Sequence, residues 1–222
     1  MSPLLDFPLF AGIPEARLAA LSLVITQKTF PSGRALFMED TWGNVVFLLQ
    51  SGWVRVRQTS RTGTLTLAVL GPKAMFGEMA ILDAVPRSTD VIAITDVQVW
   101  LIPASKFQDL LHQENSFTYA LARQLAERLR QSNYRRYLQK QSPALRLVAV
   151  LVHLFEAFGQ GSPPEIWLLS SQDLADLADT TPELVDKGLE RLGQEGMVQR
   201  DPQKQRLLCP ALDRLTQLLQ SV

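Results

Sequence analysis

The feature that most constrains this chain is a change of hydrophobic pattern at Pro103. Before Pro103, short apolar runs are separated by turn residues, and the segment WVRVR (53–57) alternates strictly between valine and larger side chains. A period of two is typical of a half-buried strand. After Pro103, apolar residues recur at helical spacing over long stretches. The pattern therefore predicts a β-rich first part and a largely helical second part.

The β-rich part is expected to fold as a sandwich or barrel. Strands are predicted over 45–58 and 65–71, and 90–103 should supply two more. Short strands at regular spacing, separated by turn residues, are typical of these all-β architectures. Residues 1–25 are predicted to form short helical pieces, because prolines interrupt them three times.

The longest predicted element is a helix over 116–139, which contains neither glycine nor proline. Ala122, Leu125, Leu129 and Ser132 follow one another in steps of three, four and three, which is the seam spacing of a coiled coil. The alternative is that the helix packs only against its own domain. Because the helix is longer than a small barrel can cover, we expect these four residues to form a homodimer interface.

The pattern after Pro143 predicts a helix-turn-helix followed by a hairpin. A buried helix over 144–158 precedes a short strand, and Ser170 or Ser171 can cap the next helix. Thr181 can cap a further helix that starts at Pro182, where a missing N–H costs nothing. Gly196 should end that helix, and a hairpin and a last helix follow. Helix, tight turn, helix and hairpin form the winged helix-turn-helix layout.

The stretch FGEMAILDAVPRST (76–89) carries the strongest chemical signal. One end offers the carboxylate of Glu78, and the other offers the cation of Arg87 with the hydroxyls of Ser88 and Thr89. A turn and a short helix between them would bring both ends together. A ligand with an anionic group and a free hydroxyl would satisfy both ends. The alternative is that Arg87 and Glu78 pair with each other across the loop.

This stretch resembles the phosphate-binding cassette of cyclic-nucleotide-binding domains. The matching positions are Gly77, Glu78, Ala80, Pro86, Arg87 and Ser88. The resemblance implies that Glu78 accepts from the ribose 2′-hydroxyl and that Arg87 and Ser88 hold the cyclic phosphate. An arginine fork independently suits phosphate oxygens. Gly77 would let the backbone approach the sugar, and the neighbouring Met79 is included in the expected site.

The pair Thr89–Asp90 departs from the cassette pattern, in which small or apolar residues are common at these positions. An additional hydroxyl at Thr89 could help to hold a guanine base. Cyclic AMP is the favoured effector, and the hydroxyl of Thr89 keeps cyclic GMP as the alternative.

From about residue 10 to residue 212, the chain resembles the cyclic AMP receptor protein / fumarate-nitrate regulator family of bacterial transcription factors. The resemblance implies an α+β fold with a jelly-roll-like β-barrel domain (1–115), a dimerisation helix and hinge (116–142) and a winged helix-turn-helix DNA-binding domain (143–222). An alignment on Arg128 and Leu129 places Ser132 and Asn133 where the family contacts the base of the nucleotide, one residue from each subunit. For Ser132, the alternative is a polar seam residue that sets the helix register.

The resemblance also implies a palindromic double-stranded DNA partner, with RNA polymerase or another protein as a further partner. The candidate DNA-binding residues are Thr181, Glu183, Lys187, Arg191, Arg200, Lys204 and Arg206. Pro182 stands where the family often has a base-contacting arginine, whereas Glu183 and Lys187 keep the usual acid-to-base spacing. From residue 143 onward, seven basic and eleven acidic side chains leave a formal charge of −4. DNA-binding domains are normally basic, so the alternative function is a cyclic-nucleotide-sensing adaptor that binds proteins.

Composition excludes several other classes. The lone cysteine, Cys209, allows neither an internal disulfide nor a cysteine-based metal cluster, and neither His112 nor His153 is expected to bind haem. No metal site and no nucleophile–base set is predicted, so the chain is not expected to be an enzyme. Lysine plus arginine equals aspartate plus glutamate at 22 each. No signal peptide and no membrane span are expected, which predicts a cytoplasmic protein.

Overall fold

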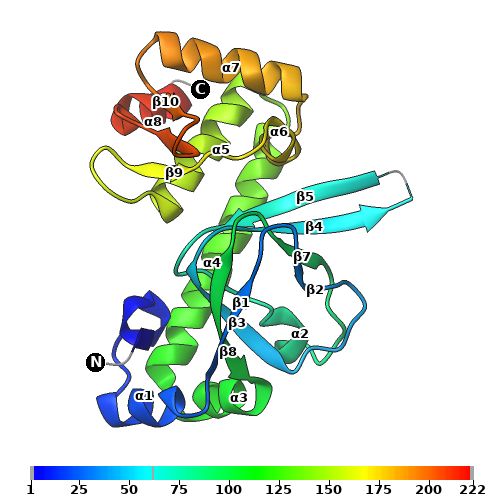
Figure 1. Cartoon of the computed structure of the whole chain (residues 1–222), viewed down its shortest axis with the longest axis vertical. Helices are drawn as coiled ribbons and strands as arrows, with labels where there is room; N and C mark the ends of the chain where they lie inside the picture. Colours follow the sequence, from blue (N-terminus) through cyan, green and yellow to red (C-terminus); the bar gives the residue numbers. More distant parts are fainter. Residues whose placement is uncertain (1–2, 62, 221–222) are drawn as a thin grey trace. The chain divides into compact units, whose positions relative to one another are not determined.

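The computed structural model describes residues 3–61 and 63–220 and divides into two compact units, Met1–Gln131 and Ser132–Val222. The first unit holds most of the strands, and the second is mainly helical, which confirms the predicted α+β class (Figure 1). The division falls inside the long helix α4 (Asn115–Leu138). The boundaries predicted after residues 115 and 142 stay predictions. No helix in the described ranges is long and apolar enough to cross a membrane.

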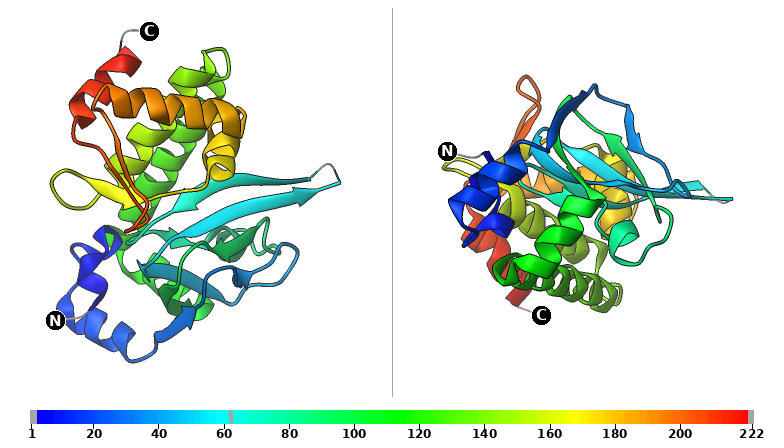
Figure 2. Two further views of the ribbon diagram at one scale, coloured as in Figure 1. Left: turned by 45° about the horizontal axis from the view of Figure 1, so that its top comes forward. Right: turned by 90° about the horizontal axis from the view of Figure 1, so that it is seen from below.

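Two antiparallel four-stranded sheets form a sandwich in the first unit. In order, one sheet contains β1 (Thr26–Phe30), β8 (Val97–Pro103), β3 (Val45–Ser51) and β6 (Met75–Phe76). The other contains β2 (Ala35–Phe37), β7 (Asp90–Ala93), β4 (Val54–Ser60) and β5 (Gly63–Leu70). The hairpin of β4 and β5 extends well beyond its neighbouring strands in every view (Figures 1 and 2).

The segment 45–58, predicted as one strand, forms two strands in different sheets. The chain crosses between the sheets at Gly52, where φ is +85°. A Cβ at this position would lie 2.3 Å from the carbonyl oxygen of Asp96, so only glycine fits. The prediction was wrong at this point because β-like residues lie on both sides of Gly52 and hide the boundary.

An apolar core lies between the first sheet and the helices that cover it. The helical elements of this part are η1 (Pro3–Asp6), η2 (Pro8–Phe10), α1 (Glu15–Ser22) and α3 (Ala104–Gln113), with the first half of α4. The ring of Phe117 on α4 lies 5.4 Å from that of Phe10 and 5.8 Å from that of Phe107, measured between centroids. These buried contacts attach the first half of α4 to the sandwich.

The second unit is built around helix α5 (Pro143–Phe158), which is largely buried. Its other elements are β9 (Glu165–Trp167), α6 (Ser171–Ala178), α7 (Pro182–Gln194), β10 (Gln199–Asp201), β11 (Arg206–Leu208) and α8 (Leu212–Gln220). A Cβ at Gly188 of α7 would lie 2.6 Å from Leu147 Cδ2, so α7 and α5 pack very closely. The small sheet has the order β10-β11-β9.

The helix boundaries of the second unit follow the predicted caps. The hydroxyl of Ser170 accepts from the backbone N–H of Asp173 at 3.1 Å, and that of Thr181 accepts from Leu184 N–H at 3.4 Å. Pro182 is the first residue of α7, and Gly196 adopts a φ of +70° just beyond its end. The winged helix-turn-helix layout is therefore confirmed.

Candidate functional site

The guanidinium of Arg87 is almost completely buried in the first unit, with 3% of the residue exposed. Its Nη2 donates to the carbonyl oxygen of Val45 at 2.7 Å, and its Nη1 donates to that of Gly77. The ring centroids of Phe37 and Phe47 lie 4.4 Å and 5.8 Å from its Cζ atom. Carbonyl dipoles and aromatic faces are both favourable surroundings for a cation.

The Nε of Arg87 is buried and has no hydrogen-bond partner in the described part of the chain. A buried donor without a partner costs about 1–3 kcal/mol, so this atom calls for an acceptor. Burial lowers the pKa of the Arg87 guanidinium below its ordinary value, and the charge of Glu78 opposes that effect. An anionic group would both satisfy the donor and offset the burial of the cation. The residues present therefore fit a phosphate.

Two glycines allow the backbone to approach this guanidinium. A Cβ at Gly77, where φ is +82°, would lie 2.7 Å from Nη1 of Arg87. A Cβ at Gly43 would lie 2.2 Å from its Cζ. The role predicted for Gly77 was a close approach of the backbone to the sugar, which stays a prediction; the close approach in the structure is to Arg87. Gly43 was missed, because nothing in the sequence links it to a residue 44 positions later.

Glu78, buried at 1% exposure, lies immediately before the short helix α2 (Met79–Leu82). Its Oε1 accepts from Nη1 of Arg128 on α4 at 2.5 Å, and Nη2 of Arg128 donates to the carbonyl oxygen of Met75. The salt bridge of Glu78 is therefore with Arg128, and the alternative of direct pairing with Arg87 is not observed. Arg128 was not predicted as a site residue, although a buried carboxylate requires a nearby cation.

The remaining candidates for nucleotide binding are less enclosed. Met79 and Ser88 are exposed, and Thr89 is half-buried next to Arg87 in sequence. Ser132 and Asn133 are exposed and belong to the second unit, so their relation to Arg87 stays a prediction.

Helix α4 presents two different apolar stripes. Phe117 and Leu121 are buried in the core of the first unit, and Leu125 packs partly against the same core. The expected seam residues Ala122, Leu129 and Ser132 are exposed, Leu129 at 62%.

The exposed residues Tyr119, Ala122, Ala126 and Leu129 also step by three, four and three. The inward position of Leu125 matches the alternative of packing within the domain, whereas the exposed stripe keeps coiled-coil spacing.

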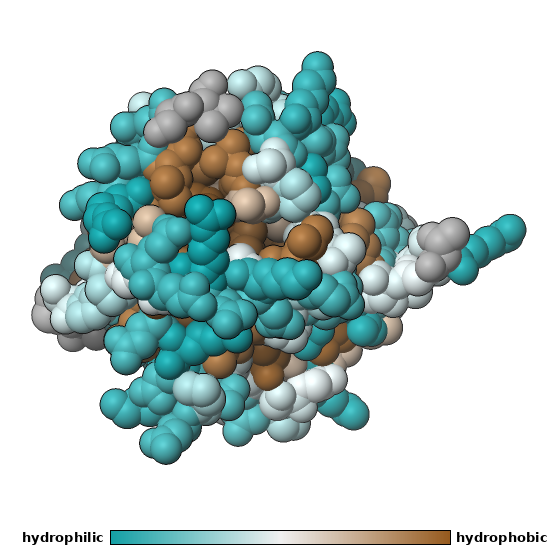
Figure 3. Space-filling view, turned by 90° about the horizontal axis from the view of Figure 1, so that it is seen from above, coloured by the Kyte–Doolittle hydropathy of each residue, from teal (hydrophilic) through white to brown (hydrophobic). Residues whose placement is uncertain are grey.

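The candidate DNA-binding residues lie on α7, at its N-cap Thr181, on strands β10 and β11 of the wing, and in the turn between these strands, which holds Lys204. Most of their cations are paired with acidic side chains: Arg191 with Glu195 (2.9 Å), Arg200 with Asp186 (3.4 Å), Lys204 with Asp201 (4.0 Å) and Arg206 with Glu165 (3.5 Å). Within the described ranges, Lys187 forms no ion pair shorter than 4.0 Å. Its side chain is exposed on α7, and hydrophilic side chains cover much of the face seen in Figure 3.

Glu183 occupies the first turn of α7 and is fully exposed. Its pKa lies below the ordinary value, chiefly because of a side-chain hydrogen bond with Thr181. The carboxylate therefore stays ionised at neutral pH, and the charge of Lys187 makes a smaller contribution to the lowered pKa.

Comparison with known proteins decides the family. Residues 27–114 match the Cyclic nucleotide-binding domain family, and residues 145–218 match the Crp-like helix-turn-helix domain family. The Cyclic AMP receptor protein of Thermus thermophilus is 33% identical over 197 residues, which cover 88% of this chain and 89% of that protein. The chain belongs to the cyclic AMP receptor protein / fumarate-nitrate regulator family. It is thus a transcription regulator of a non-enzymatic family, with a cyclic-nucleotide-binding domain and a DNA-binding helix-turn-helix domain.

Two further relatives cover most of the chain. The CRP-like cAMP-activated global transcriptional regulator of Mycobacterium tuberculosis is 26% identical, over 86% of this chain and 87% of that protein. The crystal structure of Thermus thermophilus Catabolite Activator Protein is 28% identical with a TM-score of 0.53, and the match covers 96% of this chain and 99% of that chain.

Proposed function

We propose that the chain is a homodimeric regulator in which cyclic AMP binds at Arg87 and Glu78 and changes the affinity for DNA. The observation that carries this proposal is the buried guanidinium of Arg87, whose Nε has no acceptor among the residues that the structure describes. The names of the Thermus and Mycobacterium relatives favour cyclic AMP as the effector. DNA as the partner implies action in the cytoplasm.

The two ends of the motif have separate tasks in this proposal. The cyclic phosphate is a monoanion that accepts from the Arg87 guanidinium. The ribose 2′-hydroxyl donates to Glu78, whose carboxylate is held in place by Arg128. Since Arg128 belongs to α4, a ligand that binds Glu78 contacts a residue that forms a salt bridge with that helix. A ligand shifts a conformational equilibrium only by its difference in affinity for the two states.

The dimer supplies the symmetry that a palindromic site requires. The exposed stripe Tyr119, Ala122, Ala126 and Leu129 is our candidate for its seam, with Ser132 and Asn133 beyond it near the base. The two α7 helices would then enter successive major grooves. Lys187 is the candidate for a base contact, and Arg200, Lys204 and Arg206 are candidates for phosphate contacts.

A second candidate function rests on the charges of the chain from residue 143 onward, the helical part that holds the helix-turn-helix. Its formal charge from residue 143 onward is −4, and four of its candidate cations already have acidic partners. A sensor that acts through protein partners, with RNA polymerase among the candidates, would need no DNA contact from these residues.

Calorimetric titration of the full chain with cyclic AMP and with cyclic GMP tests the ligand assignment. We expect saturable binding of cyclic AMP, with cyclic GMP weaker. Absence of binding for both nucleotides would refute the site, and tighter binding of cyclic GMP would refute the choice of base.

A further inference from the structure

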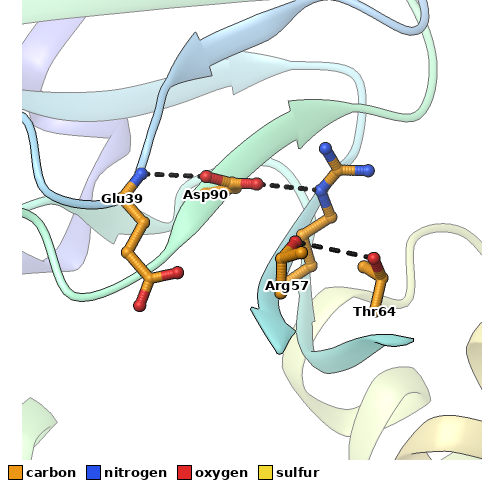
Figure 4. Close-up of polar contacts among 5 residues, drawn as sticks. Glu39, Arg57, Thr64 and Asp90 are labelled. Atoms are coloured by element: carbon orange, nitrogen blue, oxygen red, sulfur yellow. Dashed lines mark hydrogen bonds and ion pairs between the residues drawn. The ribbon is translucent and has the colours of Figure 1, made fainter. Parts of the chain in front are cut away.

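Asp90, the first residue of β7, is a buried carboxylate in the part of the motif that departs from the family pattern. One oxygen, Oδ1, accepts from the backbone N–H of Glu39 at 2.8 Å. The other, Oδ2, accepts from Nε of Arg57 on β4 at 3.1 Å (Figure 4). A single side chain therefore connects the segment after β2 to the middle of the second sheet.

The segment connected by Asp90 also forms one wall of the Arg87 site. The N–H of Asp40 donates to the carbonyl oxygen of Arg87 at 2.9 Å, and the N–H of Arg87 donates to that of Thr41 at 2.9 Å. At its two ends, Phe37 covers the guanidinium with its ring and Gly43 lies directly against it. Residues 37–43 thus contact both the backbone and the side chain of Arg87.

Segment 37–43 requires contacts that fix its backbone. Asp40 has a φ of +59°, in the left-handed region that is uncommon for residues other than glycine. Such a strained conformation persists only where several surrounding contacts hold the backbone in place. One residue before Asp40, the N–H of Glu39 donates to Asp90. The N–H of Asp40 itself and the carbonyl oxygen of the next residue, Thr41, form the two hydrogen bonds to the backbone of Arg87. The salt bridge with Arg57 in turn compensates the burial of the Asp90 carboxylate.

We propose that Asp90, neutralised by Arg57, is a positioning residue that holds segment 37–43 in the shape required for Arg87 to bind an anion. The effect on affinity rests on the proposed function. Asp90 then acts on the anion site through segment 37–43, which its bond to Glu39 N–H holds in place.

The test compares Asp90→Ala with Asp90→Asn in the full chain. Without the bond to Asp90, segment 37–43 must be ordered again upon binding, so Asp90→Ala should weaken cyclic AMP binding at least tenfold. Asp90→Asn keeps an oxygen for Glu39 N–H but loses the acceptor for Arg57 Nε, and it should remain within about threefold of the parent, because the bond to segment 37–43 is kept. Asp109→Ala removes an exposed ion pair on α3 and serves as the matched control.

Amide hydrogen exchange supplies a readout that needs no ligand. Asp90→Ala should speed exchange at the N–H groups of Asp40 and Arg87 about tenfold or more, and Asp109→Ala should leave them unchanged. If Asp90→Ala does not fold, Asp90→Val, which also lacks an acceptor, replaces it with the same expectations. Unchanged exchange at both amides would overturn the proposal, as would faster exchange with unchanged affinity. If the parent binds no cyclic nucleotide, the proposed function fails, and exchange alone decides whether Asp90 holds the segment.

Discussion

At the scale of single residues, the account depends on Arg87. Replacing it with alanine should lower cyclic nucleotide affinity at least tenfold, because a hydrogen bond to a charged group contributes about 1.5–3 kcal/mol and about 1.4 kcal/mol corresponds to a factor of ten. Arg87→Lys should not restore affinity, since an ammonium lacks the fork that matches phosphate oxygens. Calorimetric titration measures both variants.

The exposed Arg130 on α4 provides the matched control for charge. Arg130→Ala should bind the nucleotide like the parent. An affinity loss below about threefold in Arg87→Ala, with an unchanged melting temperature, would contradict the assignment of the anion site.

The single cysteine allows another residue-scale prediction. Burial raises the pKa of the Cys209 thiol, with a smaller opposing effect from a backbone hydrogen bond with Ala211. The thiol is therefore protonated at neutral pH, and the thiolate is the reactive form. A disulfide reagent at pH 8 should react at least about tenfold more slowly with the folded chain than with the chain in denaturant. Equal rates would show that Cys209 is accessible.

The candidate site residues that the sequence indicated lie within one short stretch, and their role in binding stays a prediction. Gly77, Glu78 and Arg87 fall within eleven positions, so their spacing alone indicated a common site. Arg128 meets Glu78 across 50 positions. Such long-range partners are set by how α4 packs on the sandwich, and hydrophobic periodicity carries no information about which cation on a helix reaches a buried carboxylate.

At the scale of elements, α4 has an inner and an outer apolar stripe, and the two should respond differently to charge. Leu129→Asp should convert the dimer to a monomer with little change in melting temperature, because Leu129 is exposed in the single chain. Leu125→Asp should lower the melting temperature, because Leu125 packs against the core of its own unit. Light scattering and thermal unfolding measure the two effects.

A parent chain that is monomeric by light scattering would contradict the proposed dimer. A Leu129→Asp variant that remains fully dimeric would show that the seam lies elsewhere on the chain.

Arg146 of α5 links the segment after α4 to the turn of the helix-turn-helix. Its guanidinium donates to the carbonyl oxygens of Ala178 (2.8 Å), Asp179 (2.5 Å), Gln139 (3.2 Å) and Gln141 (3.2 Å). Arg146→Met should lower the free energy of unfolding by about 2–3 kcal/mol, since several carbonyls lose a charged donor. Urea unfolding measures the loss, and the exposed Arg214→Met is the control. A change below about 0.5 kcal/mol would contradict this role.

Helices were easier to predict from the sequence than strands. Ser170, Thr181 and Gly196 mark helix ends with local chemistry, and the structure places them there. Strands β2 and β6 contain only three and two residues, too few to show a period of two. They are defined by pairing with distant strands, which no local pattern reveals.

At the scale of the whole molecule, the excess of acidic residues from 143 onward should make DNA binding weakly dependent on salt. The slope of log affinity against log salt is about −0.9 per neutralised phosphate, and four of the seven basic side chains in this part of the described chain are already paired with acidic ones. We therefore expect a shallow slope, measured by titration of duplex DNA at several salt concentrations. A slope near −10, as for a strongly basic DNA-binding protein, would contradict the expected small number of phosphate contacts.

Two lysines of the second unit should act differently on DNA. Lys187→Ala should cost about 1–3 kcal/mol and relax preference at one base pair, because Lys187 is the candidate for a base contact. Lys204→Ala should weaken binding to all sequences alike, as expected for a phosphate contact. Competition binding with single-base variants of the DNA site separates these outcomes. If both variants lose affinity for all sequences alike, or both lose preference at one base pair, the different roles assigned to the two lysines are refuted.

If a cyclic nucleotide at Arg87 controls DNA binding by a dimer, the nucleotide should change which duplexes the chain selects. We propose selection from random duplexes with and without saturating cyclic AMP or cyclic GMP. Cyclic AMP should lead to enrichment of a palindromic sequence with half-sites about one helical turn apart, and Arg87→Ala should abolish this response. If no sequence is enriched with either nucleotide, the regulator account is contradicted and the sensor that acts through protein partners replaces it.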